Sequence, residues 1–199
     1  MSFSLSEDQR QVQDSIRRVA TEKVAPRAAK IDRDGVYPQD MFDLLRELGL
    51  FTLPFPTEFG GTGSMVSACV AVEELCRVCY NTAYLLVVQW VPFGAILAGG
   101  NQEQKARYLP GLANGTLRSA ISTTEAQSGS DVAGIRTRAK HVDGGYRLNG
   151  AKIWCTNSSV ADFVLVAARV IDQADVSKSG SLNLFIVNRD APGFTIGPA

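Results

Sequence analysis

The sequence lacks an excess of charge of either sign. Lysine and arginine together number 20, and aspartate and glutamate also number 20, so the formal net charge is zero. We therefore do not expect nucleic acid as a main partner, because binding to phosphates needs a basic excess or a basic stripe. The N-terminal stretch MSFSLSEDQRQ also lacks the basic head and apolar run of a signal peptide.

Histidine is nearly absent and cysteine is sparse. The chain has one histidine, His141, and four cysteines, Cys69, Cys76, Cys79 and Cys155. Cys76 and Cys79 form a C-x-x-C pair, but no second pair of ligands at a matching spacing completes a zinc site, so no metal is expected. The helical pattern around the pair predicts buried thiols. Without a disulfide framework, we expect a reducing, cytoplasmic setting.

No apolar run is long enough to suggest a membrane span. The most apolar window, AYLLVVQWVPFGAILA at residues 83–98, is interrupted by Gln89 and Pro92. A spanning helix needs about 20 predominantly apolar residues. We interpret this window as a buried helix.

The first half of the chain has the periodicity of helices. Ser6 and Gln9 have capping-box spacing ahead of an apolar stripe that is expected to end before Pro26. Further helices are predicted at residues 38–49, 64–79, 82–98 and 101–115. In the connector LPFPTEFGGTG (53–63), Gly60, Gly61 and Gly63 are expected to adopt conformations that a side chain disfavours.

After Gly115 the pattern changes to strands. DGG at residues 143–145 predicts a hairpin turn, and the segments 161–170 and 181–190 are rich in strand-forming residues, with another extended piece expected from 191. Helices followed by strands predict an α+β fold, with an N-terminal all-helical domain at 1–116 and an antiparallel β-barrel or sandwich domain at 117–199. Because an antiparallel sheet that stops here leaves an open edge, we expect further sequence or a partner chain to complete it.

The stretch STTEAQSGSDVAG at residues 122–134 is typical of neither a core strand nor an amphipathic helix. Its small residues allow close approach of the backbone to a ligand, and its amides and hydroxyls suit an anion such as a pyrophosphate. Thr124 follows the strand-like RSAIS, so it is expected at a rigid strand end. The alternative is an ordinary surface loop with serine and threonine turns.

A second polar stretch, NGAKIWCTNSSVAD at residues 149–162, places Trp154, Cys155 and Thr156 between a hairpin strand and a turn. A buried indole beside a hydroxyl suits a flat heteroaromatic ligand, while the alternative is a core tryptophan at the edge of a sandwich. Two hydroxyl-bearing strand ends in one small domain predict a shared site.

Four motifs in order resemble the N-terminal half of the acyl-CoA dehydrogenase family. TEAQSGSDVAG (124–134) matches Thr-Glu-x-x-x-Gly-Ser-Asp, and GAKIWCTNSSVAD (150–162) matches Gly-x-Lys-x-Trp-x-Thr-Asn followed by Ala-Asp. The connector at 53–63 and the segment NQEQKARYLPGLANG at 101–115 resemble two further family segments. Thr123 stands where the family usually has an aliphatic residue.

The resemblance implies a helical domain, a middle β domain and a C-terminal helical bundle that is absent from this chain, with FAD as cofactor. Thr124 is implied to bind the pyrimidine edge of the flavin, Ser130 the pyrophosphate and the thioester substrate, and the Thr156 hydroxyl to lie near flavin N5. The residues implied to bind the cofactor are Ile121, Ser122, Thr123, Thr124, Ser128, Gly129, Ser130, Trp154, Cys155 and Thr156.

The implied reaction is α,β-dehydrogenation of an acyl-CoA or acyl-carrier-protein thioester, in lipid metabolism, with hydride transfer to flavin N5. The implied base is a glutamate beyond residue 199, so no catalytic residue is assigned here, and Glu125 is placed in the flavin loop rather than as the base. The remaining acids are expected on solvent faces of helices or in turns, among them Glu7, Asp8, Glu22, Asp43, Glu47, Asp143, Asp172 and Asp175. Implied partners are an electron-transfer flavoprotein or similar acceptor and either further copies of the chain or a completing second chain.

Two alternatives stay open at this point. One is a flavin monooxygenase or oxidase on the same scaffold, because one fold can host several chemistries. The other is a partial subunit that binds flavin or a partner chain without turnover.

Overall fold

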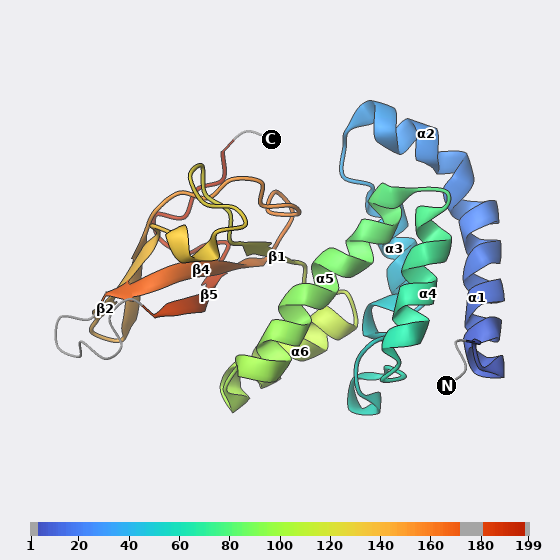
Figure 1. Cartoon of the computed structure of the whole chain (residues 1–199), viewed down its shortest axis with the longest axis horizontal. Coiled ribbons are helices and arrows are strands. Elements are labelled where there is room, and N and C mark those ends of the chain that lie inside the picture. The colour runs from blue at the N-terminus through green and yellow to red at the C-terminus, as the bar shows by residue number, and fades with distance from the viewer. Residues whose placement is uncertain (1–3, 172–180, 198–199) are drawn as a thin grey trace. The chain divides into compact units, whose positions relative to one another are not determined.

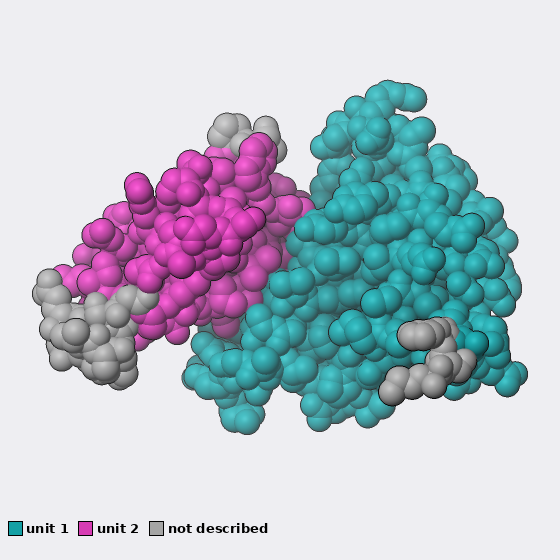
Figure 2. Space-filling view, in the orientation of Figure 1, with its two compact units in different colours: residues 1–116 teal, residues 117–199 magenta. Residues whose placement is uncertain are grey.

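The computed structural model describes residues 4–171 and 181–197 and divides the chain into two compact units, Met1–Thr116 and Leu117–Ala199 (Figures 1 and 2). The first unit is helical and the second is built on a sheet. The α+β class predicted from the sequence is therefore confirmed.

Six α-helices and three short turns of helix make up the described part of the first unit. Phe42, Phe51, Leu45, Leu75 and Leu86 are each almost fully buried in its apolar core. The elements are α1 (Glu7–Val19), the π-helical turn η1 (Ala20–Val24), α2 (Ala25–Asp34), α3 (Gln39–Glu47), the 3₁₀ turns η2 (Leu50–Thr52) and η3 (Thr57–Phe59), α4 (Met65–Cys76), α5 (Tyr80–Gly99) and α6 (Gln102–Ala113).

The first helix begins as predicted but does not end where it was expected to. Ser6 Oγ accepts from the Gln9 N–H at 3.2 Å, and the Gln9 side chain accepts from the Ser6 N–H at 2.9 Å, which confirms the capping box. The expected stop before Pro26 is wrong. The π-helical turn η1 joins α1 to α2, and Pro26 lies in the first turn of α2, where a missing N–H is tolerated.

A buried carboxylate joins α1 to α4. Glu74 is 2% exposed and accepts hydrogen bonds from Arg17 Nη2 at 2.8 Å, Arg17 Nε at 3.0 Å and Gln13 Nε2 at 3.0 Å. The hydrogen bond from Arg17 lowers the pKa of Glu74. Placing the acids outside the threonine stretch on solvent faces or in turns is wrong for Glu74, because its pairing with Arg17 cannot be read from its own helix. Asp172 and Asp175 lie outside the described residues.

The connector between α3 and α4 has the glycine geometry predicted for it. Gly60 and Gly63 have φ values of 77° and 67°, in the left-handed region that favours glycine. A Cβ on Gly61 would lie only 2.1 Å from the Phe55 carbonyl oxygen. The expectation for these three positions is confirmed.

Helix α5 is longer than the predicted 82–98 and almost entirely apolar. By length and composition alone it could cross a membrane, and half of its most apolar stretch is buried inside the structure (Figure 1). The core helix of a soluble protein passes the same test. Gln89, which is 1% exposed, donates to the Leu112 carbonyl of α6 at 3.3 Å, so its amide is satisfied within the helical unit.

The cysteines of the C-x-x-C pair differ in exposure. Cys79 is buried and accepts from the Thr82 hydroxyl at 3.2 Å, whereas Cys76 is exposed near the C-terminal end of α4. The prediction of a buried pair is therefore wrong for Cys76. Within residues 4–171 and 181–197, no group of three or more His, Cys, Asp or Glu residues is arranged to hold a metal ion.

The second unit is organised around the long apolar strand β4. Strand β5 pairs antiparallel to one edge of β4, and β1 and β2 pair parallel to β4 along the opposite edge. Strand β3 pairs antiparallel to β2, through the hairpin predicted at 143–145. The strands are β1 (Ser119–Ser122), β2 (Arg138–Val142), β3 (Gly145–Asn149), β4 (Phe163–Ile171) and β5 (Leu182–Asn188), with the 3₁₀ turn η4 (Val132–Gly134) before β2.

Two expectations about this sheet are wrong. The sheet is mixed rather than wholly antiparallel, because β1 and β2 run parallel to β4. Alternation of apolar and polar residues indicates a strand but not the direction of its partner. The extended piece expected from residue 191 is not a strand within the described residues up to 197, where the chain turns at Gly193 with φ 81°.

One face of the β2–β3 hairpin carries cations without counter-ions. Arg136, Arg138 and Lys140 are exposed and alternate with buried residues, and Lys140 lies directly opposite Arg147 across the two strands. None of these four side chains forms an ion pair within the described part of the chain. Like charges directly opposite each other destabilise a strand pair.

Replacing Lys140 by glutamate is therefore expected to stabilise the hairpin by about 0.2–1 kcal/mol. The measurement is native-state hydrogen exchange of the β2 and β3 amides, which reports the local free energy of opening. The double variant Lys140→Glu/Arg147→Glu restores a like-charge pair and should lose this gain. A gain of equal size in the double variant would contradict the explanation.

Candidate functional site

The threonine motif forms a loop that leaves and returns to one edge of β4. Strand β1 ends with Ser122 opposite Val166, and β2 begins with Arg138 opposite Arg169. The threonine loop, residues 123–137, therefore starts and ends beside neighbouring positions of β4, next to Val166 and Arg169. The Arg169 N–H donates to the Thr137 carbonyl at 2.8 Å, which fixes the returning end.

The second motif runs beside the edge of β1 that β4 leaves open. Trp154 and Asn157 have φ values of 57° and 73°, so this segment cannot continue as a regular strand. Most of its hydrogen bonds to β1 and to the two residues that follow it come from side chains instead of the main chain. The hydrogen bonds are Asn157 Nδ2 to Ser119 O at 2.8 Å, Cys155 Sγ to Ile121 O at 3.5 Å, Lys152 Nζ to Thr123 O at 3.0 Å and Ile153 N to Thr124 O at 2.9 Å.

The structure thus brings the two sequence motifs together, as a shared site requires. Within the described residues, no hydrogen bond involves the main-chain N–H of Thr123 or Thr124, or the hydroxyl of Thr124 or Thr156. Thr124 is half-buried and Thr156 is exposed. Main-chain and hydroxyl donors of this kind suit the nitrogen and oxygen atoms along the edge of a flavin ring.

Trp154 lies on the surface, so both sequence interpretations of a buried indole are wrong. It is 85% exposed, and its backbone is left-handed with φ 57°. A bulky residue with positive φ is a real outlier that costs about 1–3 kcal/mol. A large flat ring held in this way is available to pack on a planar ligand.

The serines of the threonine loop divide into two groups. Ser128 is 2% exposed, and its hydroxyl donates to the Asp131 carbonyl at 2.5 Å, so this side chain is used within the loop. Ser122 is 5% exposed in β1. Gly129 and Ser130 are exposed at the outer part of the loop, and the Ser130 hydroxyl has no hydrogen bond within the described structure. Ser130 is therefore the serine of this loop whose hydroxyl is available to an anion.

Glu125 closes the base of the threonine loop. It is 5% exposed and accepts hydrogen bonds from four residues. Burial alone would raise its pKa, but the hydrogen bonds from Lys152, Thr137 and Arg136 outweigh burial and lower the pKa far below its usual range. The donors are Lys152 Nζ at 2.8 Å, Thr137 N at 2.8 Å, Thr137 Oγ1 at 2.5 Å, Arg136 N at 2.7 Å and Gln127 Nε2 at 2.5 Å.

Sequence reasoning missed Lys152 as a member of this site. The family resemblance assigned roles to aromatic and hydroxyl side chains. Lys152 belongs to the matched motif, but no role was assigned to it. The signal that could have found it is charge: Glu125 is the one acid near the start of the first motif, and Lys152 is the one base within GAKIWCTN. A buried acid requires a partner, and the other motif supplies one.

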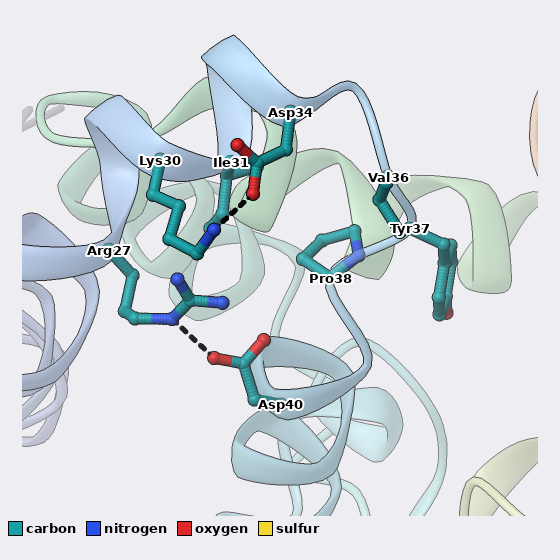
Figure 3. A pocket seen from close by; sticks show the side chains of 8 residues that line it. All are labelled: Arg27, Lys30, Ile31, Asp34, Val36, Tyr37, Pro38 and Asp40. Carbon is teal, nitrogen blue, oxygen red and sulfur yellow. Dashed lines mark hydrogen bonds and ion pairs between the residues drawn. The ribbon is translucent and has the colours of Figure 1, made fainter.

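Two hollows lie in the described part of the structure, and the larger one borders this site at Glu125. An open groove of about 410 Å³ lies on the sheet unit between the base of the threonine loop and the start of β2, with Arg136 and Arg138 in its lining. A smaller hollow of about 110 Å³ lies between α2 and α3 in the helical unit (Figure 3). There Arg27 pairs with Asp40 at 2.5 Å and Lys30 pairs with Asp34, so the charges of the smaller hollow balance and favour no charged ligand.

The pKa of Glu125 predicts how the sheet unit responds to acid. Folding lowers this pKa from 4.5, so the associated stability is complete above about pH 4.5 and is lost as the pH falls through the folded value. Glu125→Gln should weaken this pH dependence and should cost about 1–3 kcal/mol near neutral pH, because one of the two acceptor oxygens is replaced by an NH2 donor and buried Lys152 loses its counter-charge. The measurement is hydrogen exchange of the β4 amides between about pH 6 and pH 3.5.

The exposed Glu103 of α6 provides the control for this experiment. Glu103→Gln should leave the pH dependence of β4 exchange as it is in the wild type, because the residue lies outside the sheet unit. An unchanged pH dependence in Glu125→Gln would show that this carboxylate does not control the acid stability of the sheet.

Comparison with known proteins agrees with this geometry. Residues 6–116 match the model of the acyl-CoA dehydrogenase N-terminal domain, and residues 120–199 match that of the middle domain. Benzylmalonyl-CoA dehydrogenase of Aromatoleum aromaticum is 37% identical over 99% of this chain and 51% of its own length. The chain therefore spans about half the length of the curated relatives that it matches.

Solved structures also match almost the whole of this chain over about half of their own length. Butyryl-CoA dehydrogenase from Megasphaera elsdenii is 32% identical with a TM-score of 0.87, covering 98% of this chain and 52% of that one. A glutaryl-CoA dehydrogenase from Mycobacterium smegmatis, solved in complex with FADH2, is 29% identical with a TM-score of 0.87, covering 96% of this chain and 48% of that one. With both units matched in order along the chain, this protein belongs to the acyl-CoA dehydrogenase family.

Proposed function

We propose that the strand-end site, where the threonine loop and the second motif (residues 149–162) meet at the end of β1, holds the flavin ring of FAD, and that the protein is an FAD-dependent dehydrogenase of acyl thioesters. The observation that carries this proposal is the meeting of the two motifs, which brings together the exposed Trp154 and donors of Thr123, Thr124 and Thr156 that have no acceptor among the described residues. The glutaryl-CoA dehydrogenase with bound FADH2 supports the choice of cofactor.

The residues present fit this cofactor. The N–H and hydroxyl of Thr124 suit the pyrimidine edge, the Thr156 hydroxyl suits N5, and the indole of Trp154 offers an apolar plane. Ser130 supplies a hydroxyl for the pyrophosphate and for the substrate. The chemistry that FAD supplies when bound is acceptance of the hydride that leaves the β carbon of the thioester. Donors at both edges stabilise the negative charge of the reduced ring.

Glu125 is unsuited to remove the α proton. Its carboxylate is buried and already accepts bonds from Lys152, Thr137, Arg136 and Gln127, and its pKa is lowered, so it is a weak base. We therefore assign the base to a carboxylate beyond residue 199, as the family resemblance implies. Residues 117–199 bind and orient, and they do not transfer the proton.

The substrate class follows from the relatives. Several relatives are named as dehydrogenases of CoA thioesters, which favours an acyl-CoA over a carrier-protein thioester and favours dehydrogenation over the monooxygenase or oxidase alternative. We further propose an electron-transfer flavoprotein or similar protein as the acceptor, a homo-oligomeric assembly and a cytoplasmic location.

The protein is expected to bind FAD, and the double variant Thr124→Val/Thr156→Val is expected to bind it more weakly. Each lost hydroxyl removes one hydrogen bond to the reduced ring, worth about 1–3 kcal/mol where the remaining partner is left unsatisfied. The flavin content and affinity should fall and the reduction potential should move downward, as measured by absorbance and by equilibration with redox dyes.

Thr21→Val is the matched control, because Thr21 is an exposed threonine on the helical unit. It should leave flavin content and potential unchanged. A double variant with wild-type flavin affinity and potential would contradict the assignment of these two hydroxyl groups.

An anaerobic titration with acyl-CoA thioesters tests the reaction itself, and it uses the flavin-loaded protein together with the segment beyond residue 199 to which we assign the base. Dehydrogenation predicts loss of the oxidised-flavin absorbance by at least one member of the series, with the enoyl-CoA as product. Mixing the reduced protein with oxygen then separates the candidates: slow reoxidation agrees with a dehydrogenase, whereas fast reoxidation coupled to oxygen insertion into a substrate would replace this proposal with the monooxygenase alternative.

A further inference from the structure

A buried ion pair links the two motifs below the proposed flavin edge. Lys152 Nζ donates to the Thr123 carbonyl at 3.0 Å and to Glu125 Oε1 at 2.8 Å. The side chains of Lys152 and Glu125 are 9% and 4% exposed. Neither side chain is among the cofactor contacts that the family resemblance implies, so both need a separate explanation.

The bond from Lys152 determines the direction of the neighbouring amide. The Thr123 carbonyl and the Thr124 N–H belong to one peptide group, which is planar and trans, so the two bonds point in opposite directions. Because Lys152 holds the carbonyl on its own side, the Thr124 N–H points away from Lys152. This N–H has no acceptor within the described residues.

Glu125 supplies the negative charge that allows the ammonium group of Lys152 to be buried. A buried ammonium group without an opposite charge is strongly disfavoured. Glu125 supplies that charge and is itself held in place by the N–H groups of Arg136 and Thr137, at 2.7 Å and 2.8 Å. The ammonium group is thus fixed against the end of β1 by the returning end of the threonine loop.

We propose that Lys152 is a positioning residue that holds the Thr123–Thr124 peptide with its N–H directed toward the flavin edge. The proposal rests on the proposed function. Without Lys152 the peptide can rotate, and rotation presents a carbonyl oxygen in place of the donor. A carbonyl oxygen repels the negative charge of the reduced flavin, so FAD binding weakens and the reduction potential falls.

The test compares three variants of the purified protein. Lys152→Met removes the donor and leaves the Glu125 carboxylate unpaired, so it should lower thermal stability, FAD affinity and the reduction potential. Lys152→Met/Glu125→Gln removes the unpaired charge, so it should regain part of the stability, while FAD affinity stays about tenfold weaker, which is the effect of one lost hydrogen bond to a charged group. Lys140→Met, on the exposed hairpin face, is the matched control and should change neither FAD affinity nor potential.

The double variant distinguishes positioning from a merely structural role. If its FAD affinity and potential recover together with its stability, the ion pair only supports the fold and the proposal is overturned. If Lys152→Met itself keeps the wild-type affinity and potential, the proposal is overturned while the proposed function stands.

The crystal structure of flavin-free Lys152→Met gives a readout that does not depend on FAD. A rotated Thr123–Thr124 peptide supports the positioning role, and a peptide in its original orientation overturns it. If the wild-type protein binds no FAD, the proposed function fails, and this structure still decides whether Lys152 sets the direction of the peptide.

Discussion

One edge of strand β4 constrains most of the sheet unit. Because β5 occupies the other edge, β1 and β2 must share this one, and the threonine loop between them has to begin and end close together. Main-chain bonding to β4 ends at Ser122 and resumes at Thr137, whose carbonyl accepts from the Arg169 N–H, so it fixes the two ends of the loop to β4 but does not join the two sides of the loop base to each other. Glu125 closes that base by accepting bonds from the N–H groups of Arg136 and Thr137. The ends of the loop thus depend on main-chain bonds to β4, and the closure of its base depends on one buried carboxylate.

The segment beside β1 shows how donors remain available for a ligand. A regular strand there would form main-chain hydrogen bonds with β1, and the N–H groups of β1 would then be unavailable to a ligand. Positive φ at Trp154 and Asn157 prevents this. Side chains of Cys155 and Asn157 donate to β1 carbonyls instead, and Lys152 donates to the carbonyl of Thr123, just after β1. The strain at Trp154 costs about 1–3 kcal/mol, and outliers of this kind cluster at functional sites. Local stability is therefore lower at the place where we propose that the two motifs bind the flavin.

Glu74 and Glu125 are stabilised in the same way but have different structural roles. Each is a buried carboxylate whose pKa is lowered by hydrogen bonds from a base and from neutral groups. Glu74 of α4 accepts hydrogen bonds from Arg17 of α1, and this pairing joins the two helices. Glu125 accepts a hydrogen bond from Lys152 of the second motif and closes the base of the threonine loop. In both cases removing the basic partner leaves a buried carboxylate without its counter-charge, which is more costly than removing the pair.

Local signals in the sequence determined the features that depend on neighbouring residues. The Ser6 capping box, the turn at 143–145 and the three connector glycines follow from side-chain size and backbone conformation over a few positions. Only the tertiary structure decided the parallel pairing with β4, the exposure of Trp154 and the bond from Lys152 to Thr123. Periodicity shows which face of a strand is apolar, but partner direction and charge pairing depend on residues far apart in the chain.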